Sequence, residues 1–495
     1  MAFLSAGAVL VLEVLALRLV GPYVGVTLQT SSAVIGVSLG AIAYGAWAGG
    51  RLADRVDPRR LLPPAFVLAA GATAVTLPVV RTFGEMLRGT AATSVLVLAA
   101  LAVFVPAALL SAIAPILVKL QLTDVGHTGR IVGALSSIGT LGGISATLVT
   151  GFVLVAALPT STILLALAGL LALAGGLLWL VLAGIRPVGR NHGGKPGTAR
   201  RPWLGIGAVL LVAGTAWTAT APSPCDVETA YQCARVAVDP ARPDGRVLLL
   251  NSSRHSYVDL ADPRHLEFAY AQWLGVVVDT LAEPAAPVRA LHLGGGGFTL
   301  PRYVSATRPG SYNRVLELDG GLVELDQQRL GVRPGPELSI AVGDGRVLLR
   351  EEATQSYDLL IGDAFGHLAV PWHLTTREFV TDVRRVLRPG GVYALNVIDF
   401  PPERLIRAEL ATIMAVFDHV ALVAPRAVLA GQHQGSNFLV VASTEPLSVA
   451  DWTPALASVA KPAAVLSGEA LVEYVGDARM LTDDFAPVDQ LLHSV

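Results

Sequence analysis

Seven long apolar runs in the first 221 residues constrain the fold more than any other feature of the chain. They lie at 4–26, 30–50, 61–80, 90–118, 131–156, 161–185 and 203–221. Most reach the ~18 or more residues that an α-helix needs to cross a ~30 Å hydrocarbon layer. The chain is also 53% hydrophobic and only 15% charged, far from the average soluble protein. We therefore predict a multi-pass cell-membrane protein whose residues 1–221 form a bundle of about seven helices in the lipid bilayer.

The Lys and Arg residues of this region predict its orientation, because loops that stay in the cytoplasm are enriched in them. If the N-terminus is inside, the outside loops carry only Arg81 and Arg88. The cytoplasmic side then carries eleven, which are Arg51, Arg55, Arg59, Arg60, Lys119, Arg130, Arg186, Arg190, Lys195, Arg200 and Arg201. An odd number of helices places the C-terminal domain outside the cytoplasm. An even number would place it inside.

After Pro222 the charge density becomes ordinary, and short strands alternate with helices. Residues 231–238 and 247–251 are typical of a β-hairpin that turns at Asp244-Gly245, and a helix is expected near 264–281. Further strands are predicted at 288–293, 314–318, 338–342, 357–362 and 391–397, with helices between them. This order predicts a Rossmann-like α/β domain with a doubly wound parallel sheet. The predicted domains are the bundle at 1–221, the hairpin and linking helix at 222–290, and the nucleotide-binding domain at 291–495.

Glycine or acidic residues follow four consecutive predicted strands. Because the carboxyl ends of parallel strands form one edge of a sheet, we expect these residues to meet there. A glycine run lets the backbone approach a ligand, and an acidic side chain on the next strand can accept ribose hydroxyls. The pattern predicts an adenosine-type ligand, although each aspartate taken singly can be only a helix cap. The residues are Gly294, Gly295, Gly296, Glu317, Asp344, Gly345 and Asp363.

Several functional classes are disfavoured by composition. The net charge of -2 leaves no basic excess for nucleic acid. No histidine cluster has metal-ligand spacing, so we expect no metal site. The two cysteines, Cys225 and Cys233, would lie about 27 Å apart on a straight strand at ~3.4 Å per residue. A disulfide between them needs the chain to turn back, and the sequence leaves both states open.

The motifs together resemble those of a known family. Leu293-Gly294-Gly295-Gly296, Leu316-Glu317-Leu318-Asp319, Gly343-Asp344-Gly345, Tyr357 to Asp363 and Leu387 to Gly391 resemble the class I methyltransferase fold in its spermidine synthase (polyamine aminopropyltransferase) branch. With the apolar runs, the layout is similar to bacterial membrane proteins that fuse a transporter-like bundle to such a domain. Gly49 to Arg55 resembles the loop between helices 2 and 3 of major facilitator transporters, so the bundle would be part of that architecture.

The resemblance implies a role for each matching residue. Gln232 and Glu317 would hold the nucleoside sugar, Asp344 the adenine amino group, and Asp363 with Tyr270 the attacking amine. The co-substrate would be decarboxylated S-adenosylmethionine or S-adenosylmethionine.

The sequence also departs from the family at three places. Gly297, Gly366 and Gln272 stand where the family has carboxylates. The loss of these charges should weaken the binding of a polycationic acceptor.

Three functions fit these observations. The first is a membrane-anchored spermidine synthase-like transferase that moves an aminopropyl group to a small-molecule amine or other acceptor. The second is an S-adenosylmethionine-dependent methyltransferase. The third is a non-catalytic adenosyl-ligand-binding or structural module on the bundle. A homo-oligomer is compatible with each.

Overall fold

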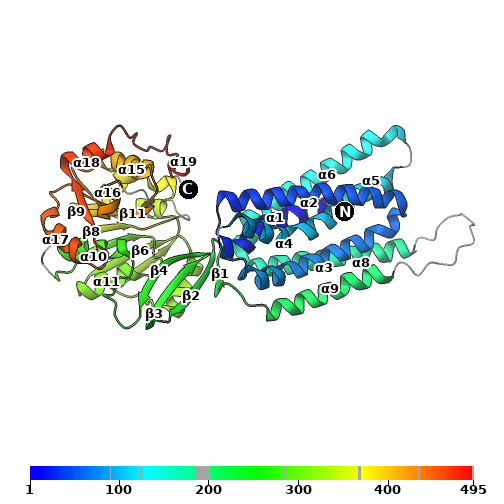
Figure 1. Ribbon diagram of the computed structural model, residues 1–495, viewed down its shortest axis with the longest axis horizontal. Helices are drawn as coiled ribbons and strands as arrows, with labels where there is room; N and C mark the ends of the chain where they lie inside the picture. The colour runs from blue at the N-terminus through cyan, green and yellow to red at the C-terminus, as the bar shows by residue number, and fades with distance from the viewer. Residues whose placement is uncertain are drawn as a thin grey trace, which may run out of the picture. The chain divides into compact units, whose positions relative to one another are not determined.

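The computed structural model describes residues 1–89, 91–122, 125–184, 201–281, 283, 285–365, 370–431 and 435–492. The chain forms two compact units (Figure 1). The helical unit contains Met1–Arg235 and Leu250–Ser253, and the α/β unit contains Val236–Leu249 and Arg254–Val495.

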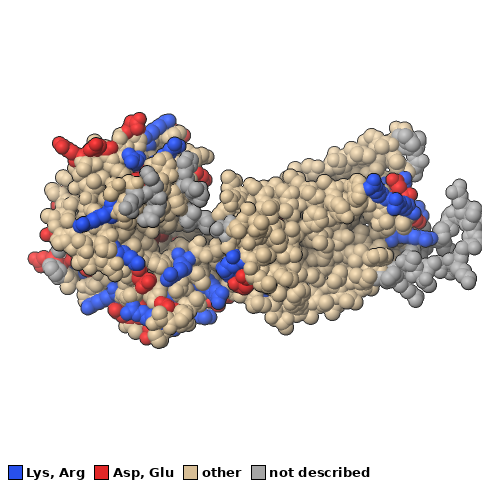
Figure 2. Space-filling model, viewed as in Figure 1, with Lys and Arg blue, Asp and Glu red and all other residues tan. Residues whose placement is uncertain are grey.

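The helical unit is built from long apolar helices. Their bounds are Ala2–Val24 (α1), Leu28–Arg55 (α2), Pro58–Gly84 (α3), Ala92–Ser111 (α4), Ile113–Gln121 (α5), Thr128–Val149 (α6), Val155–Ala157 (α7), Thr160–Gly184 (α8) and Arg201–Thr220 (α9). In the described residues, seven helical stretches have the length and composition to cross a membrane, the number predicted from the sequence. On the part of the face drawn in colour in Figure 2, charged side chains lie at the ends of these helices rather than along their sides.

Glycines let neighbouring helices approach closely. A Cβ atom on Gly45 or Gly49 of α2 would overlap the backbone of Ala108 or Ala112, at the end of α4. Small residues four positions apart are typical of helix pairs in membranes. Residues 49–55 form the last turns of α2 and not a loop as the resemblance implied. Helix α2 continues to Arg55, and the next helix, α3, begins at Pro58 with Asp57 as its cap.

A small antiparallel sheet follows α9 in the chain. Its strands are Val227–Glu228 (β1), Cys233–Asp239 (β2), Arg242–Leu250 (β3) and Ser253–Asp259 (β4), in that order. The predicted turn at Asp244-Gly245 is wrong, because both residues lie inside β3. The chain reverses at residues 240–241, where a proline has no N–H for the ladder and Asp239 Oδ1 accepts the N–H of Ala241 at 2.9 Å.

The α/β unit contains a sheet of eight strands in the order β12-β10-β11-β9-β8-β5-β6-β7. All five strands predicted after residue 287 are confirmed, and they pair in parallel. They are Arg289–Leu293 (β5), Tyr312–Glu317 (β6), Leu338–Val342 (β7), Tyr357–Gly362 (β8) and Leu387–Asp399 (β9).

The sheet is nevertheless mixed, which corrects the expectation of a wholly parallel one. His419–Ala424 (β10), Ser436–Ser443 (β11) and Ala464–Ser467 (β12) pair antiparallel, and β11 joins the sheet at β9.

Helices cover both faces of this sheet. Alternate residues of each strand point to opposite sides, so a strand contributes apolar side chains to both cores. Leu291 and Leu360 face the core formed with α14 and α15, whereas Ala290 and Leu359 face the core formed with α10 and α11. The helices of this unit are Ala269–Thr280 (α10), Thr299–Thr307 (α11), Gly320–Arg329 (α12), Gly345–Glu351 (α13), Arg377–Val386 (α14), Arg404–Met414 (α15), Arg426–Leu429 (α16), Val449–Ser458 (α17), Gly468–Val475 (α18) and Val488–Leu491 (α19).

Candidate active site

The glycine loop after β5 lies directly against the end of β8. Gly294 has φ 90° and donates its N–H to the carbonyl of Leu316 at 2.9 Å. A Cβ atom on Gly294 would lie 2.5 Å from the carbonyl oxygen of Asp363, so the contact requires glycine. The N–H of Asp363 in turn donates to the carbonyl of Leu293 at 2.9 Å. The structure thus brings the predicted loop and the predicted catalytic aspartate together.

Glu317, at the end of β6, fastens this loop. Its Oε2 accepts the N–H of Gly295 at 2.7 Å, and its Oε1 accepts the N–H of Asp319 at 2.9 Å. Burial raises the pKa of Glu317, and the backbone hydrogen bonds act in the opposite direction. The N–H of Gly296 is a third backbone partner of this carboxylate, which has about four acceptor positions in all. Binding of ribose hydroxyls by Glu317 stays a prediction.

Asp344 caps a helix, as its alternative interpretation anticipated. Its Oδ1 accepts the N–H groups of Arg346 and Val347, each at 3.0 Å, at the start of α13. Its Oδ2 lies 3.0 Å from Nε2 of His373. Gly345 is the first residue of the capped helix. The contact of Asp344 with an adenine amino group stays a prediction.

Asp363 has two side-chain partners. The hydroxyl of Tyr270 donates to Oδ2 at 3.0 Å, and Nδ2 of Asn396 donates to Oδ1 at 2.8 Å. Asn396 is oriented by Asn437, which donates to its Oδ1 at 3.0 Å. Burial raises the pKa of Asp363 to about 6, although the bonds from Asn396 and Tyr270 lower it. The site therefore holds a carboxylate that takes up a proton more readily than an ordinary aspartate.

The pairing of Asp363 with Tyr270 matches the roles that the resemblance implied. The two asparagines were missed. Asn396 did carry a signal, because it is an amide in an otherwise apolar and buried stretch of β9. Asn437 gave none, since a polar residue at the start of a strand is common.

A small cavity lies behind the glycine loop. Its lining includes Tyr270, His292, Gly294, Gly295 and Asp363, and its volume of about 20 Å³ has room for about one water molecule. A nucleoside therefore requires the open edge of the sheet rather than this cavity. Within the described residues, no three His, Cys, Asp or Glu side chains are placed to hold a metal ion.

Packing accounts for two of the departures from the family. A Cβ atom on Gly297 would lie 3.0 Å from Cβ of Ser256 and 3.1 Å from Cγ2 of Val258, so a side chain there would crowd β4. Gln272 donates through Nε2 to the carbonyl of Leu266 at 2.9 Å and accepts the N–H of Lys461 at 3.0 Å. A glutamate could not make the first bond.

Gly366 and Gln232 are the remaining positions named from the resemblance. Gly366 falls outside the described residues. Gln232 belongs to the helical unit, where its N–H donates to Oγ1 of Thr229 at 3.0 Å and where it lines a cavity with Arg18 and Arg81. Its role toward a nucleoside stays a prediction.

Comparison with known proteins supports the family assignment. No family model matches the chain. It is 27% identical over 219 residues to a polyamine aminopropyltransferase of Vibrio vulnificus, covering 41% of this chain and 70% of that protein. It is 29% identical over 192 residues to a polyamine aminopropyltransferase of Prochlorococcus marinus, covering 37% of this chain and 66% of the relative.

Solved structures include a similar protein. The crystal structure of a probable spermidine synthase from Corynebacterium glutamicum is 28% identical, with a TM-score of 0.49, and the match covers 52% of this chain and 95% of that one. The relatives' names support aminopropyl transfer at the level of the family. Together with the glycine loop, Glu317 and Asp363 on one sheet edge, the two relatives support a spermidine synthase-like family with the class I methyltransferase fold.

Proposed function

We propose that this chain is a membrane-anchored transferase that moves an aminopropyl group from decarboxylated S-adenosylmethionine to an amine. The single observation that carries the proposal is the carboxylate of Asp363. It lies beside the glycine loop, is held by Tyr270 and Asn396, and has its pKa raised to about 6 by burial. A group with this pKa is ionised at pH 7 and basic enough to accept a proton from an amine as that amine reacts.

The residues around the glycine loop fit an adenosyl group. The glycines leave the backbone open to close approach, and the Glu317 carboxylate, with about four acceptor positions in all, accepts the N–H groups of Gly295, Gly296 and Asp319. When bound, the donor supplies a sulfonium carbon that a nucleophile can attack. In this proposal Glu317 holds the ribose, and an acceptor amine approaches Asp363, which directly follows β8, on the other side of β5 from β6.

The proposed reaction balances as a substitution at carbon. The amine nitrogen uses its lone pair to form a C–N bond with the aminopropyl carbon. The C–S bond breaks, its electron pair stays on sulfur, and neutral methylthioadenosine leaves. The nitrogen, now positively charged, gives one proton to the carboxylate of Asp363, which passes it to solvent. The step requires the neutral amine, because a protonated amine has no lone pair with which to form the C–N bond.

We infer that the acceptor carries few positive charges. Gly297 has no carboxylate and is packed against Ser256 and Val258, and the amide of Gln272 is engaged by backbone groups. In the described lining of the cavity beside the glycine loop, the carboxylates are those of Asp363 and Glu267. A monoamine, or an amine with a neutral tail, requires fewer counter-charges than a polyamine.

We also propose that the helical unit spans a membrane and that the α/β unit lies outside the cytoplasm. The seven apolar stretches support the first part, and the Lys and Arg distribution supports the second. A disulfide between Cys225 and Cys233 is compatible with an oxidising compartment. The test is labelling of intact cells with an impermeant thiol reagent, using Arg333→Cys in the α/β unit and Arg59→Cys at the start of α3. We expect labelling at 333 only, and labelling at 59 only would refute the orientation.

The catalytic proposal is tested with the full-length protein in detergent. Decarboxylated S-adenosylmethionine is supplied with a monoamine, a diamine or a triamine, and methylthioadenosine and the aminopropylated amine are measured by mass. We expect both products in equal amounts, with the monoamine used at least as well as the triamine. Methylated amine formed from S-adenosylmethionine, with no aminopropyl product, would show a methyltransferase instead. Absence of both reactions would favour a binding module.

A further inference from the structure

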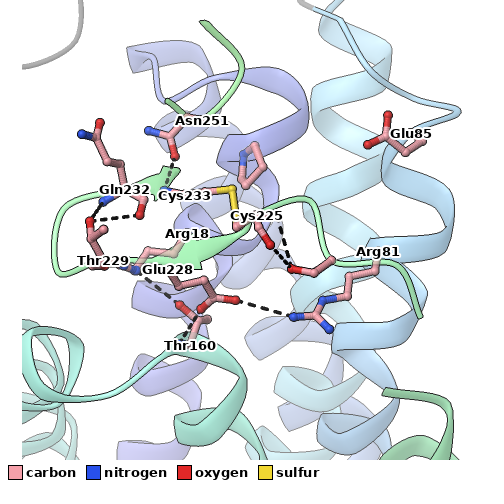
Figure 3. The surroundings of a disulfide bond; sticks show 12 residues. Arg18, Arg81, Glu85, Thr160, Cys225, Glu228, Thr229, Gln232, Cys233 and Asn251 are labelled. Carbon is pink, nitrogen blue, oxygen red and sulfur yellow. Dashed lines mark hydrogen bonds and ion pairs between the residues drawn. A yellow bond between two sulfur atoms is a disulfide. The ribbon is translucent and has the colours of Figure 1, made fainter. Parts of the chain in front are cut away.

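A second cavity lies in the helical unit. It has a volume of about 140 Å³, and its lining includes Arg18, Arg81, Glu228, Tyr231 and Asn251. Figure 3 shows Arg18, Arg81, Glu228 and Asn251 around the disulfide. Arg18 comes from α1, Arg81 from α3, and the other three from the segment between α9 and β4. Charged residues inside a bundle of apolar helices are costly and usually mark a functional site.

The wall of this cavity is held rigidly. Cys225 and Cys233 form a disulfide whose Cα atoms lie 5.2 Å apart, so the segment between them is a closed loop. Arg18 donates to the carbonyl of Ala230 at 2.7 Å and to the carbonyl of Thr229, and these bonds fasten the loop to α1. A cavity with fixed walls needs little reorganisation to bind a ligand.

The two arginines have different surroundings. Arg18 is committed to the loop carbonyls and to Oγ1 of Thr160, which lies 3.3 Å from its Nε. Arg81 is nearly buried, with 12% of its side chain exposed, and its Nη2 lies 3.6 Å from Oε1 of Glu228. That separation exceeds a hydrogen bond. Among the described residues no acceptor forms a hydrogen bond with Arg81, although a guanidinium has five N–H donors.

Glu228 does not remove the positive charge of the cavity. Its Oε2 accepts the N–H of Thr160 at 2.7 Å, which ties the carboxylate to the start of α8. Two guanidinium groups against one carboxylate leave a net charge of +1 among Arg18, Arg81 and Glu228. A cation is therefore repelled, and a monoanion is attracted.

We propose that this cavity binds a small carboxylate anion through Arg81. The planar fork of a guanidinium matches the two oxygens of a carboxylate, and a bidentate pair is strongest where water is excluded. Tyr23, Leu77 and Val80 supply an apolar wall for a short hydrocarbon tail, and Tyr231 and Asn251 supply neutral hydrogen-bonding groups. The volume suits a molecule of a few carbon atoms, well below the ~300 Å³ of a drug-sized pocket.

The test uses the full-length protein in detergent and butyrate as the probe. Affinity is measured by calorimetric titration and by the increase of Tm. Butyramide, which has the same shape without the charge, and inorganic phosphate serve as comparison ligands. We expect butyrate to bind and to raise Tm, and butyramide and phosphate to do neither. Binding of butyramide as tight as that of butyrate, binding of phosphate alone, or no binding of butyrate would each overturn the proposal.

Variants locate the site. Arg81→Gln should weaken butyrate binding at least tenfold. Arg59→Gln, an equivalent change at an exposed position at the other end of α3, should leave it unchanged. If Arg81→Gln fails to fold, Arg81→Lys keeps the charge beside Glu228 but lacks the fork, and it should still weaken binding severalfold. Unchanged affinity in either folded Arg81 variant would contradict the assignment.

Discussion

Tyr270 on α10 donates its hydroxyl hydrogen to Oδ2 of Asp363 at the end of β8, across 3.0 Å and 93 positions of sequence. This bond opposes the effect of burial on the carboxylate, which alone would favour the protonated acid. The balance brings the pKa of Asp363 to about 6, within the range that a general base needs near neutral pH. Tyr270 is thus expected to set the acidity of its partner as well as its orientation.

Tyr270→Phe should shift the acidic limb of the pH–rate profile upward. In the wild type, activity should fall as the pH drops through about 6, because Asp363 then becomes protonated. Loss of the hydroxyl removes a bond that favours the ionised form, so the midpoint should rise by about one pH unit, equivalent to ~1.4 kcal/mol. The rate is measured from pH 5 to 9. An unchanged midpoint with a lower plateau would mean that Tyr270 only packs against the site.

The same carboxylate should reduce the stability of the fold at neutral pH. The folded-state pKa of Asp363, about 6, is higher than the ordinary aspartate value of 3.8. The folded protein therefore binds more protons between these values and loses stability as the pH rises through them. Asp363→Asn cannot ionise and should therefore have a higher Tm than the wild type at pH 7. The difference should disappear below about pH 4. A Tm difference that is the same at pH 4 and pH 7 would show that ionisation is not its cause.

Glu317→Ala should weaken the binding of methylthioadenosine at least tenfold. Hydrogen bonds to a charged group contribute about 1.5 to 3 kcal/mol, and the variant also frees the N–H of Gly295, which Glu317 now holds. Titration of the full-length protein measures the affinity. Glu324→Ala, which removes an exposed carboxylate from α12, is the matched control and should bind normally. Equal affinity in the two variants would mean that the sugar is not held at Glu317.

Replacement of both cysteines by serine should destabilise the helical unit. Cys225 and Cys233 are eight positions apart, and closure of so short a loop is worth about 2 to 3 kcal/mol in the chain-entropy account. Thermal unfolding with and without reductant should show a lower Tm for the serine variant and for the reduced wild type. Free thiols in protein purified without reductant would count against the bond.

The parallel part of the α/β sheet was predictable, because each strand was a short apolar run that ended in glycine or an acidic residue. The antiparallel strands β10, β11 and β12 were missed. β10 is followed by Pro425 and β11 by Thr444, whereas β12 is followed by Gly468 but is only four residues long. The turn at Asp244-Gly245 was misplaced, since the turn-forming pair lies inside β3 and the reversal depends on Asp239 and its bond to Ala241. Pairing of β3 with its neighbouring strands outweighed the turn preference of Asp244 and Gly245.

The candidate site was predicted to a different extent at each position. The sequence placed Glu317 and Asp363 on the correct edge, because strand ends meet there by topology. It could not show that Glu317 binds the glycine loop or that Asn396 binds Asp363, since these contacts depend on the register between strands. The disulfide also stayed open, because its formation depends on a reversal of the chain between Cys225 and Cys233 that spacing alone does not fix.

The most direct test of the proposed function is the rate of aminopropyl transfer in Asp363→Asn. Asparagine keeps the size of the side chain and can still bond to Tyr270 and Asn396, but it cannot accept the proton of the amine. The full-length wild type and variant are compared at pH 7.5 with decarboxylated S-adenosylmethionine and a monoamine, and methylthioadenosine affinity is measured in parallel. We predict that the rate falls by about 10²-fold or more in the variant, the usual scale for loss of a general base, and that the affinity changes little. A variant that transfers the aminopropyl group as fast as the wild type would contradict the account.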